Sequence, residues 1–227
     1  MQKTEFIQWA TQLAINYKPA ADVLEKLKHV RVISFVGPTG VGKTTLIHAS
    51  GLPYVLSDVT RDKREGEKDD HDYHFKNNYE EILTDIKQGQ YVQFVINTNH
   101  EFYGTRANQY PDGGVCAMAI IAKAIPQFRT LGFADILPIY ILPPSYVEWM
   151  HRIGSARSSD LEARFTEARE SLPIALADPT YHFVLNDNIE DAVDDIKLIA
   201  EGKPIAEHRD FLARQTAELL IGRLGEV

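Results

Sequence analysis

The chain has 227 residues, of which 44% are hydrophobic and 25% are charged, a globular composition that excludes an intrinsically disordered chain. With 24 Lys and Arg against 32 Asp and Glu, the formal net charge is −8, which argues against a nucleic-acid partner because polyanion binding normally shows as a basic excess. A single cysteine excludes an internal disulfide, and no apolar run approaches the roughly 20 residues of a membrane span, so we expect a cytoplasmic protein with no membrane partner.

Along the chain, predicted strands alternate with predicted helices. Short apolar runs rich in β-branched residues predict strands, and apolar residues at helical spacing predict helices. Strands are expected at residues 32–36, 54–56, 90–96, 115–121, 136–142 and 181–185. Helices are expected within residues 1–30, interrupted near Lys18-Pro19, and at 43–49, 79–87, 145–153, 158–176, 189–201 and 205–224. This alternation predicts an α/β fold with a parallel sheet, in which 115–121 and 136–142 are central strands; the polar residues 58–78 are expected to form a loop.

Residues 37–44 read G-P-T-G-V-G-K-T and match the phosphate-loop pattern G-x-x-x-x-G-K-[ST], between a predicted strand and a predicted helix. In such a loop, glycines let backbone N–H groups point at an anion, and the helix N-terminus adds positive potential. Lys43 is expected to reach the β- and γ-phosphates of ATP, and the Thr44 hydroxyl to bind Mg²⁺. The expected ATP-binding residues are Gly37, Pro38, Thr39, Gly40, Val41, Gly42, Lys43, Thr44 and Thr45. The loop alone does not distinguish a kinase from a GTPase or an ATPase.

A second cluster suited to an anion follows the second predicted strand. Arg61 and Arg64 lie three residues apart, near the hydroxyl groups of Ser57 and Tyr73. Guanidinium groups bind phosphate oxygens bidentately, and a tyrosine hydroxyl adds a further hydrogen bond. Because the same region carries many acids, the residues alone leave a phosphate site and a solvated charged loop equally open.

Residues 57–75 carry S-x-x-T-R-x-x-R-x-G-E and then D-Y-H-F, and in this segment the chain resembles the guanylate kinase family. Further similarities follow in the family's order: F-Y-G-T at 102–105, P-P-S at 143–145, the arginines Arg152, Arg157 and Arg164, and N-D at 186–187. The resemblance implies the P-loop NTPase fold, a parallel sheet flanked by helices with a small inserted monophosphate-binding lobe and a short helical lid.

The resemblance also implies a division of the chain. Residues 31–201 would form the guanylate kinase-like domain, with the acceptor-binding lobe at 58–105 and the lid at 146–170. Residues 1–30 and 202–227 would be N-terminal and C-terminal helical extensions.

The resemblance further implies a role for each matched residue. The phosphate of the acceptor nucleotide would be held by Ser57, Arg61, Arg64, Tyr73 and Tyr103. Thr105 would contact the acceptor base. The groups that stabilise the transferring phosphoryl group, and so act in catalysis, would be Lys43, Arg152, Arg157 and Arg164. ATP and Mg²⁺ would be the cofactors.

Two positions depart from the family pattern. The family's base-reading glutamate is replaced by Gln93, whose amide offers one acceptor and one donor group to the paired donors of guanine. One guanine donor would stay unpaired, at a cost of about 1–3 kcal/mol, unless water or a shifted base satisfies it. The family's acidic D-x-D-x-Q-G motif corresponds to residues 115–123, which hold no acid. Asp58 is the candidate to replace it as a metal ligand.

Three further features are interpreted as structural. The apolar face of Phe6, Trp9 and Leu13 is expected to pack against the sheet domain or a partner subunit. Cys116 lies in a predicted buried strand and is expected to be an inert thiol. The histidines and acids of residues 69–74 resemble a metal cluster, but the family motif accounts for them without a metal.

The sequence therefore predicts an enzyme that transfers a phosphoryl group from ATP to a nucleoside monophosphate, either GMP or a related nucleotide. The alternative is a catalytically weak guanylate kinase-like module that binds nucleotides or a protein partner. The intact Lys43-Thr44 pair favours the enzyme, whereas Gln93 and the missing acidic motif favour the alternative or a different acceptor. A homodimer is left open.

Overall fold

The structure is a computed structural model that describes residues 1–64, 66–97, 99–154 and 158–225. It divides into two compact units, each built from separate pieces of the chain. The first unit comprises Met1–Arg31, Val55–Cys116 and Thr130–Ala134. The second comprises Val32–Tyr54, Ala117–Arg129 and Asp135–Val227.

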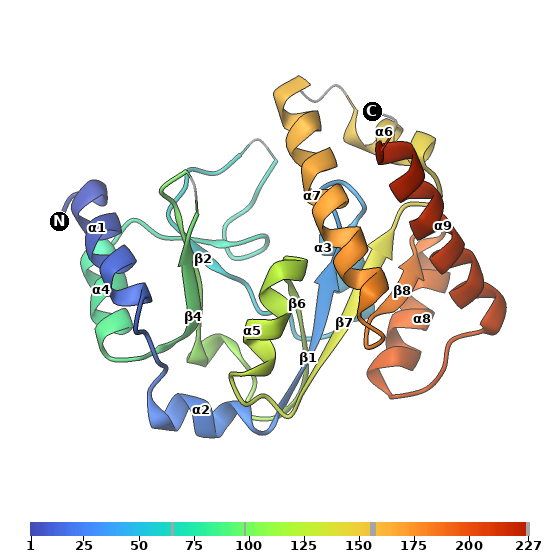
Figure 1. Cartoon of the computed structure of the whole chain (residues 1–227). Helices are drawn as coiled ribbons and strands as arrows, with labels where there is room; N and C mark the ends of the chain where they lie inside the picture. The colour runs from blue at the N-terminus through green and yellow to red at the C-terminus, as the bar shows by residue number, and fades with distance from the viewer. Residues whose placement is uncertain (65, 98, 155–157, 226–227) are drawn as a thin grey trace. The chain divides into compact units, whose positions relative to one another are not determined.

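A four-stranded sheet with the order β6-β1-β7-β8 runs through the second unit. Its strands are β1 (Val30–Val36), β6 (Gly114–Ala119), β7 (Asp135–Leu142) and β8 (His182–Leu185) (Figure 1). β7 and β8 are parallel, with Ile139 opposite His182. Most residues of β1 and β7 are buried, as expected for strands covered on both faces. The predicted α/β fold with a parallel sheet flanked by helices is confirmed.

One predicted strand of this sheet is reduced to a single bridge. Tyr54 forms an isolated parallel bridge with Ala117, and the predicted strand at 54–56 is absent from the described residues. Pro53 accepts a hydrogen bond from Ala117 N at 2.8 Å through its carbonyl, but proline has no N–H to extend a ladder. β6 therefore lies at the end of the four-strand order, not at its centre as predicted.

Helices surround this sheet, and two of them begin at a capping side chain. Ser145 accepts a hydrogen bond from Glu148 N at the start of α6, and Asn188 accepts one from Glu190 N at the start of α8. The helices of the second unit are α3 (Lys43–Ser50), α5 (Ile125–Arg129), which follows the short 3-10 helix η2 (Ala122–Ala124), α6 (Tyr146–Ile153), α7 (Ser158–Ala177), α8 (Ile189–Ala200) and α9 (Glu207–Gly225). Among the described residues, no helix is both long and apolar enough to cross a bilayer.

The last helix, α9, is an integral part of the second unit. Ala213, Ala217 and Leu220 form its buried face. Arg209 at its start donates to Asp195 of α8 at 2.6 Å. Since Asp195 is itself buried, this ion pair satisfies a carboxylate that would otherwise lack a partner in the interior.

The first unit contains a second, smaller sheet with the order β3-β2-β5-β4. β2 pairs with β3 in parallel and with β5 in the antiparallel sense, and β5 pairs with β4 in the antiparallel sense. Its elements are α1 (Lys3–Ala14), α2 (Ala21–Leu27), β2 (Asp58–Val59), β3 (His74–Phe75), α4 (Tyr79–Lys87), β4 (Tyr91–Ile96), β5 (Phe102–Arg106) and the 3-10 helix η1 (Ala107–Gln109). The strand β5 was not predicted.

The N-terminal helix α1 completes the core of this first unit. Phe6, Ile7 and Ala10 of α1 are buried in one cluster with residues of α4, β4 and β5. The Phe6 ring stacks on Tyr79 at 5.3 Å between centroids. The helix therefore packs against a sheet of its own chain, which agrees with the first of the two expected alternatives. The prediction also placed Trp9 in the packed face, but 47% of its surface is exposed.

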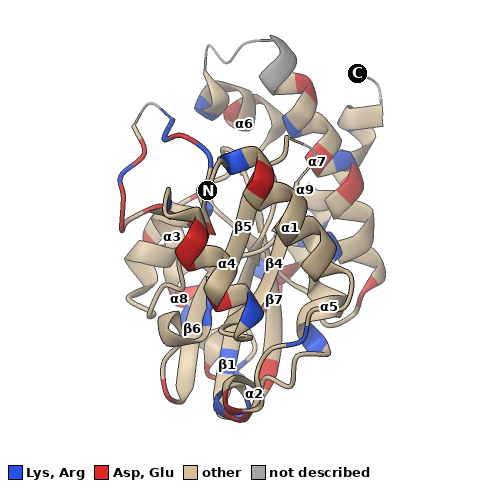
Figure 2. Cartoon of the chain, turned by 90° about the vertical axis from the view of Figure 1, so that its left-hand side faces the viewer, with Lys and Arg blue, Asp and Glu red and all other residues tan. Residues whose placement is uncertain are grey.

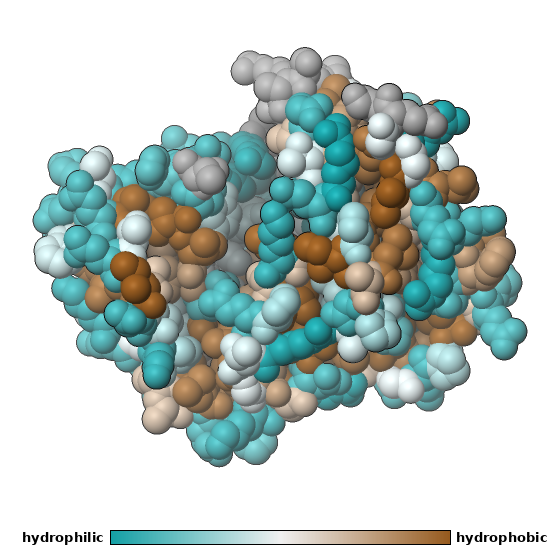
Figure 3. Space-filling model, viewed as in Figure 1, coloured by the Kyte–Doolittle hydropathy of each residue, from teal (hydrophilic) through white to brown (hydrophobic). Residues whose placement is uncertain are grey.

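The surface of the chain carries charged and apolar side chains in small groups. Figure 2 shows Lys and Arg interspersed with Asp and Glu over the face that includes α1 and α4. Figure 3, viewed from the same side as Figure 1, shows apolar areas broken up by polar side chains.

Candidate active site

The phosphate loop lies between β1 and α3 in the second unit, as predicted, and other elements hold its backbone. Trp149 of α6 donates from Nε1 to Thr39 O at 3.1 Å, and Asn186, after β8, donates from Nδ2 to Val41 O at 2.7 Å. Gly42 has φ 96°, and a Cβ there would collide with the Asn186 amide, so only glycine fits. The loop therefore has a fixed backbone that suits an anion nest at the N-terminus of α3.

Lys43 begins α3 and points back over the loop. Its Nζ donates to the carbonyl oxygens of Gly37 and Pro38, the second at 3.1 Å. Burial lowers the pKa of Lys43 from its ordinary value, while the charge of Glu167 acts in the opposite direction. A desolvated ammonium group is stabilised by an anion, so a phosphate group would be a better partner for Lys43 than the two carbonyls.

Glu167 of α7 contacts the loop and was not predicted as a site residue. Its Oε2 accepts from Thr39 N at 3.0 Å and from Thr39 Oγ1 at 3.2 Å. It lies three residues after Arg164, a spacing that places both side chains on one face of a helix. That spacing from a predicted lid arginine is the sequence signal that could have identified Glu167.

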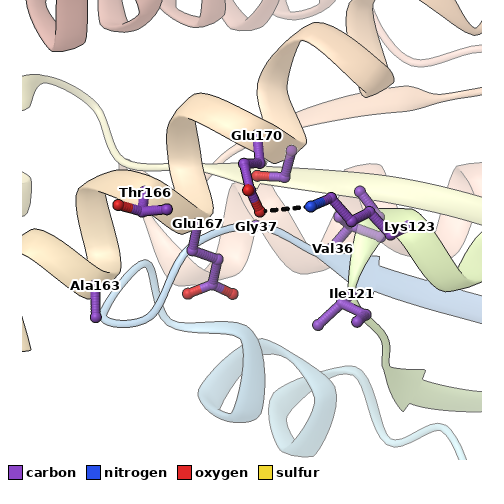
Figure 4. A pocket seen from close by; sticks show the side chains of 10 residues that line it. Val36, Gly37, Ile121, Lys123, Ala163, Thr166, Glu167 and Glu170 are labelled. Carbon is purple, nitrogen blue, oxygen red and sulfur yellow. Dashed lines mark hydrogen bonds and ion pairs between the residues drawn. The ribbon is translucent and has the colours of Figure 1, made fainter. Parts of the chain in front are cut away.

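A cavity of about 220 Å³ lies beside Glu167, between α7 and the segment that follows β6 (Figure 4). Gly37 of the phosphate loop also lines it. Lys123, in the segment where the family resemblance places acids, forms an ion pair with Glu170 at 2.8 Å. Around this cavity the cation therefore follows β6, and the carboxylates come from α7.

The predicted lid arginines differ in their placement. Arg152 donates from Nε to Glu148 at 3.0 Å and from Nη2 to Asn186 O at 3.0 Å, so it supports the same residue that holds the loop. The Nη1 atom of Arg164 lies 3.8 Å from where a Cβ on Gly40 would stand, directly beside the loop. Arg157 lies outside the described residues.

In the first unit, three of the predicted phosphate ligands come together. Arg61 donates from Nε to Tyr103 OH at 3.1 Å, and its guanidinium lies 4.9 Å from the centroid of the Tyr73 ring. Both terminal nitrogens of Arg61 bind Glu67 at 2.6 Å. These hydrogen bonds raise the pKa of Arg61, and burial raises the pKa of Tyr73, so the arginine is charged and the tyrosine is neutral. Arginine and tyrosine donors suit a phosphate, and in this structure Glu67 accepts from both terminal nitrogens of Arg61.

The other predicted acceptor ligands lie around this cluster with fewer contacts to it. Arg64 donates from its backbone N to Glu67 at 2.8 Å, and its side chain is exposed. Ser57 is half-buried and accepts from His74 N at 2.9 Å through its carbonyl. Their roles toward a phosphate stay predictions.

The two predicted base-contacting residues face each other across the β4–β5 ladder, where Gln93 is paired with Thr105. The Gln93 side chain is half-buried. Thr105 is fully buried, and its hydroxyl shares a hydrogen bond of 2.9 Å with Tyr110 OH. In this arrangement the Thr105 hydroxyl is directed into the unit, and its contact with a base stays a prediction.

Asp58 is fully buried in the first unit and is surrounded by donors. Its Oδ2 accepts from Tyr91 OH and from Arg106 Nε, both at 2.7 Å, and its Oδ1 accepts from Gln109 Nε2 at 2.8 Å. Burial and the Asp58 carboxylate both raise the pKa of Tyr91, which therefore stays a donor. These contacts favour a structural role for Asp58 over the expected metal ligand. No group of three or more His, Cys, Asp or Glu side chains suited to a metal occurs among the described residues.

The parallel sheet, the glycine loop leading into α3 and the separate arginine–tyrosine cluster define a P-loop protein of the nucleoside monophosphate kinase class. A family model described as guanylate kinase matches residues 29–203. The guanylate kinase of Oceanobacillus iheyensis is 31% identical over 198 residues, covering 81% of this chain and 92% of that protein. The guanylate kinase of Bacillus subtilis is 32% identical over 192 residues, covering 78% and 89%.

The chain belongs to the guanylate kinase family. Its fold also matches the crystal structure of guanylate kinase from Anaplasma phagocytophilum, with a TM-score of 0.53 at 24% identity. That alignment covers 86% of this chain and 97% of the other. The family resemblance and the P-loop NTPase fold expected from the sequence are both confirmed.

Proposed function

We propose that this protein transfers the γ-phosphoryl group of ATP to a nucleoside monophosphate, with GMP as the first acceptor to test. One observation supports the proposal: each unit holds its own cluster of groups whose chemistry suits a phosphate. Lys43 and the loop supply one, and the Arg61, Tyr73 and Tyr103 cluster supplies the other. Transfer between two phosphates needs two such sets, whereas an ATPase or a simple nucleotide-binding module needs one. GMP is chosen because the named relatives are guanylate kinases.

The catalytic contribution of the chain would be positioning and charge. Lys43 and Arg164 beside the loop would stabilise the negative charge on the transferring phosphoryl oxygens, and Arg61 would hold the acceptor phosphate. No covalent protein nucleophile is needed. When bound, Mg²⁺ would neutralise phosphate charge. Thr44, in the first turn of α3, would hold it through its hydroxyl, and phosphate oxygens and water would complete its coordination, as Mg²⁺ commonly permits.

The identity of the acceptor base depends on Gln93. A glutamate would accept from two guanine donors, whereas a glutamine pairs with only one of them. IMP lacks the exocyclic amino group of GMP, so selectivity for GMP over IMP should be weak. We place this reaction in the cytoplasm, where an enzyme would meet both ATP and several monophosphates.

An ADP-release assay with ATP and Mg²⁺ tests the proposal across GMP, dGMP, IMP, AMP and pyrimidine monophosphates. We expect ADP release that depends on a purine monophosphate and is highest with GMP. The matched control is Arg61→Lys, which keeps the charge but loses the bidentate fork and should raise the KM for the acceptor without changing the affinity for ATP. ATP binding without stimulation by any monophosphate would contradict the proposal.

That contradicting result would support the second candidate, a family member that binds nucleotide and turns over weakly. The observation that favours it is the region after β6. Residues 115–123 hold no acid, and Lys123 forms an ion pair with Glu170. Size-exclusion chromatography of the same preparation would establish whether a homodimer forms.

A further inference from the structure

The phosphate loop is bound by a carboxylate of the chain itself. Glu167 Oε2 accepts from both the backbone N–H and the hydroxyl of Thr39, the third residue of the loop. A carboxylate and a phosphate compete for the same kind of donors, because both are oxyanions that accept charge-assisted hydrogen bonds. Glu167 therefore takes the position toward these donors that a phosphate oxygen would take.

The two α7 carboxylates at this cavity, Glu167 and Glu170, have different partners. Glu170 lines the same cavity one turn further along α7, and its charge is compensated by Lys123 at 2.8 Å (Figure 4). Glu167 instead accepts hydrogen bonds from the loop donors, and its negative charge stabilises the charged form of Lys43. The cation that would attract the triphosphate is thus already partly compensated by Glu167.

We propose that Glu167 is an intramolecular competitor for the triphosphate of ATP and sets the affinity of the phosphate loop for its donor nucleotide. This inference rests on the proposed function, because it assumes that the loop binds ATP. For the triphosphate to reach the loop donors, the two hydrogen bonds to Thr39 must break and the carboxylate must move away from the incoming negative charge. The free energy spent on this exchange lowers the affinity for ATP.

The variant Glu167→Gln tests the proposal because it keeps the size of the side chain and removes its charge. Loss of one charge-assisted interaction that opposes binding should tighten ATP binding on the order of tenfold. Glu170→Gln is the matched control, because it removes a carboxylate from the same cavity without touching the loop, and should change the affinity less than twofold. Adenosine, which carries no phosphate, should bind the Glu167→Gln variant as it binds the unmodified protein.

The chain carries its own reporter for this measurement. Trp149 donates to Thr39 O, so we expect its fluorescence to respond to changes in the loop. A Trp9→Phe background leaves Trp149 as the single tryptophan, since the sequence has two. Titrations with ATP, with and without Mg²⁺, then give the dissociation constants. Glu167→Asp, which withdraws the carboxylate from Thr39 by one methylene, provides a second variant if the glutamine variant is unstable.

The outcomes separate the inference from the proposed function. Tighter binding of ATP, with adenosine unchanged, supports the inference. If Glu167→Gln and the unmodified protein bind ATP with equal affinity, and the unmodified protein does transfer phosphoryl groups, the inference alone is overturned. Weaker binding only in the presence of Mg²⁺ would overturn it by making Glu167 a metal ligand. Absence of ATP binding by the unmodified protein and by both Glu167 variants would overturn the inference and the proposed function together.

Discussion

Removal of the Asp58 carboxylate should destabilise the protein and leave its requirement for Mg²⁺ unchanged. In Asp58→Ala, Arg106 Nε, the Tyr91 hydroxyl and Gln109 Nε2 lose their acceptor inside the first unit. Breaking a buried ion pair from one side costs about 3–5 kcal/mol, because the remaining charge stays desolvated. Arg106 keeps Glu81 at 3.0 Å and Asp85 at 2.8 Å, so we expect the lower end of that range, about 3 kcal/mol of unfolding free energy.

Urea denaturation followed by circular dichroism measures the loss of stability, and the ADP-release assay measures the Mg²⁺ concentration that gives half-maximal turnover. Asp85→Ala is the matched control. It removes another carboxylate from the same Arg106, but Asp85 is partly exposed, so the loss should be about 1 kcal/mol or less. A stability change below about 1 kcal/mol for Asp58→Ala, or a tenfold higher Mg²⁺ requirement in a protein of unchanged stability, would refute the structural role.

Three further predictions concern the packing of α1, the recognition of the acceptor base and the buried cysteine. Phe6→Ala should lower the unfolding free energy by about 3–5 kcal/mol in urea denaturation, whereas Trp9→Ala on the exposed side of the same helix should cost less than about 1 kcal/mol; equal effects would contradict the packing of α1. Gln93→Glu should raise the preference for GMP over IMP by about tenfold in kcat/KM, and an unchanged ratio would remove Gln93 from base recognition. Burial raises the pKa of Cys116 to about 12, so its thiol is protonated at pH 8 and should react with a disulfide reagent only after unfolding; rapid reaction of the native protein would show that it is accessible.

Continuous sequence patterns predicted most of the elements around the main sheet. The predicted helix 79–87 is α4, and the predicted strand 136–142 is β7 with one residue added. β5 was missed because its five residues include Gly104, which is a poor strand former in isolation. In the fold, a Cβ at Gly104 would lie within 3 Å of the Phe102, Phe94 and Tyr91 side chains, so the glycine is required by aromatic packing that only the paired strands create.

The candidate site divides in the same way between local and long-range features. The phosphate loop is one contiguous segment, and its glycines, lysine and threonine identify it without any knowledge of the fold. Glu167 lies 128 residues from Thr39, and no local pattern links the two. Asp58 illustrates the same limit: its position next to Ser57 suggested the site, whereas its contacts with Tyr91 of β4 and Arg106 of β5 hold it in the interior.

The order in which segments are made matters for a chain whose two units are both discontinuous. The first unit draws on Met1–Arg31 and Val55–Cys116 and ends with Thr130–Ala134, while the second begins at Val32 and includes the last helix, α9. During synthesis, α1 must therefore wait with its apolar face uncovered until α4, β4 and β5 have left the ribosome. The main sheet cannot be covered until α9 has followed. All segments of the first unit have been made once Ala134 has left the ribosome, whereas the second unit still lacks α6 to α9 at that point. The second unit therefore completes last, and its partly covered sheet lengthens the interval in which chaperones would be needed.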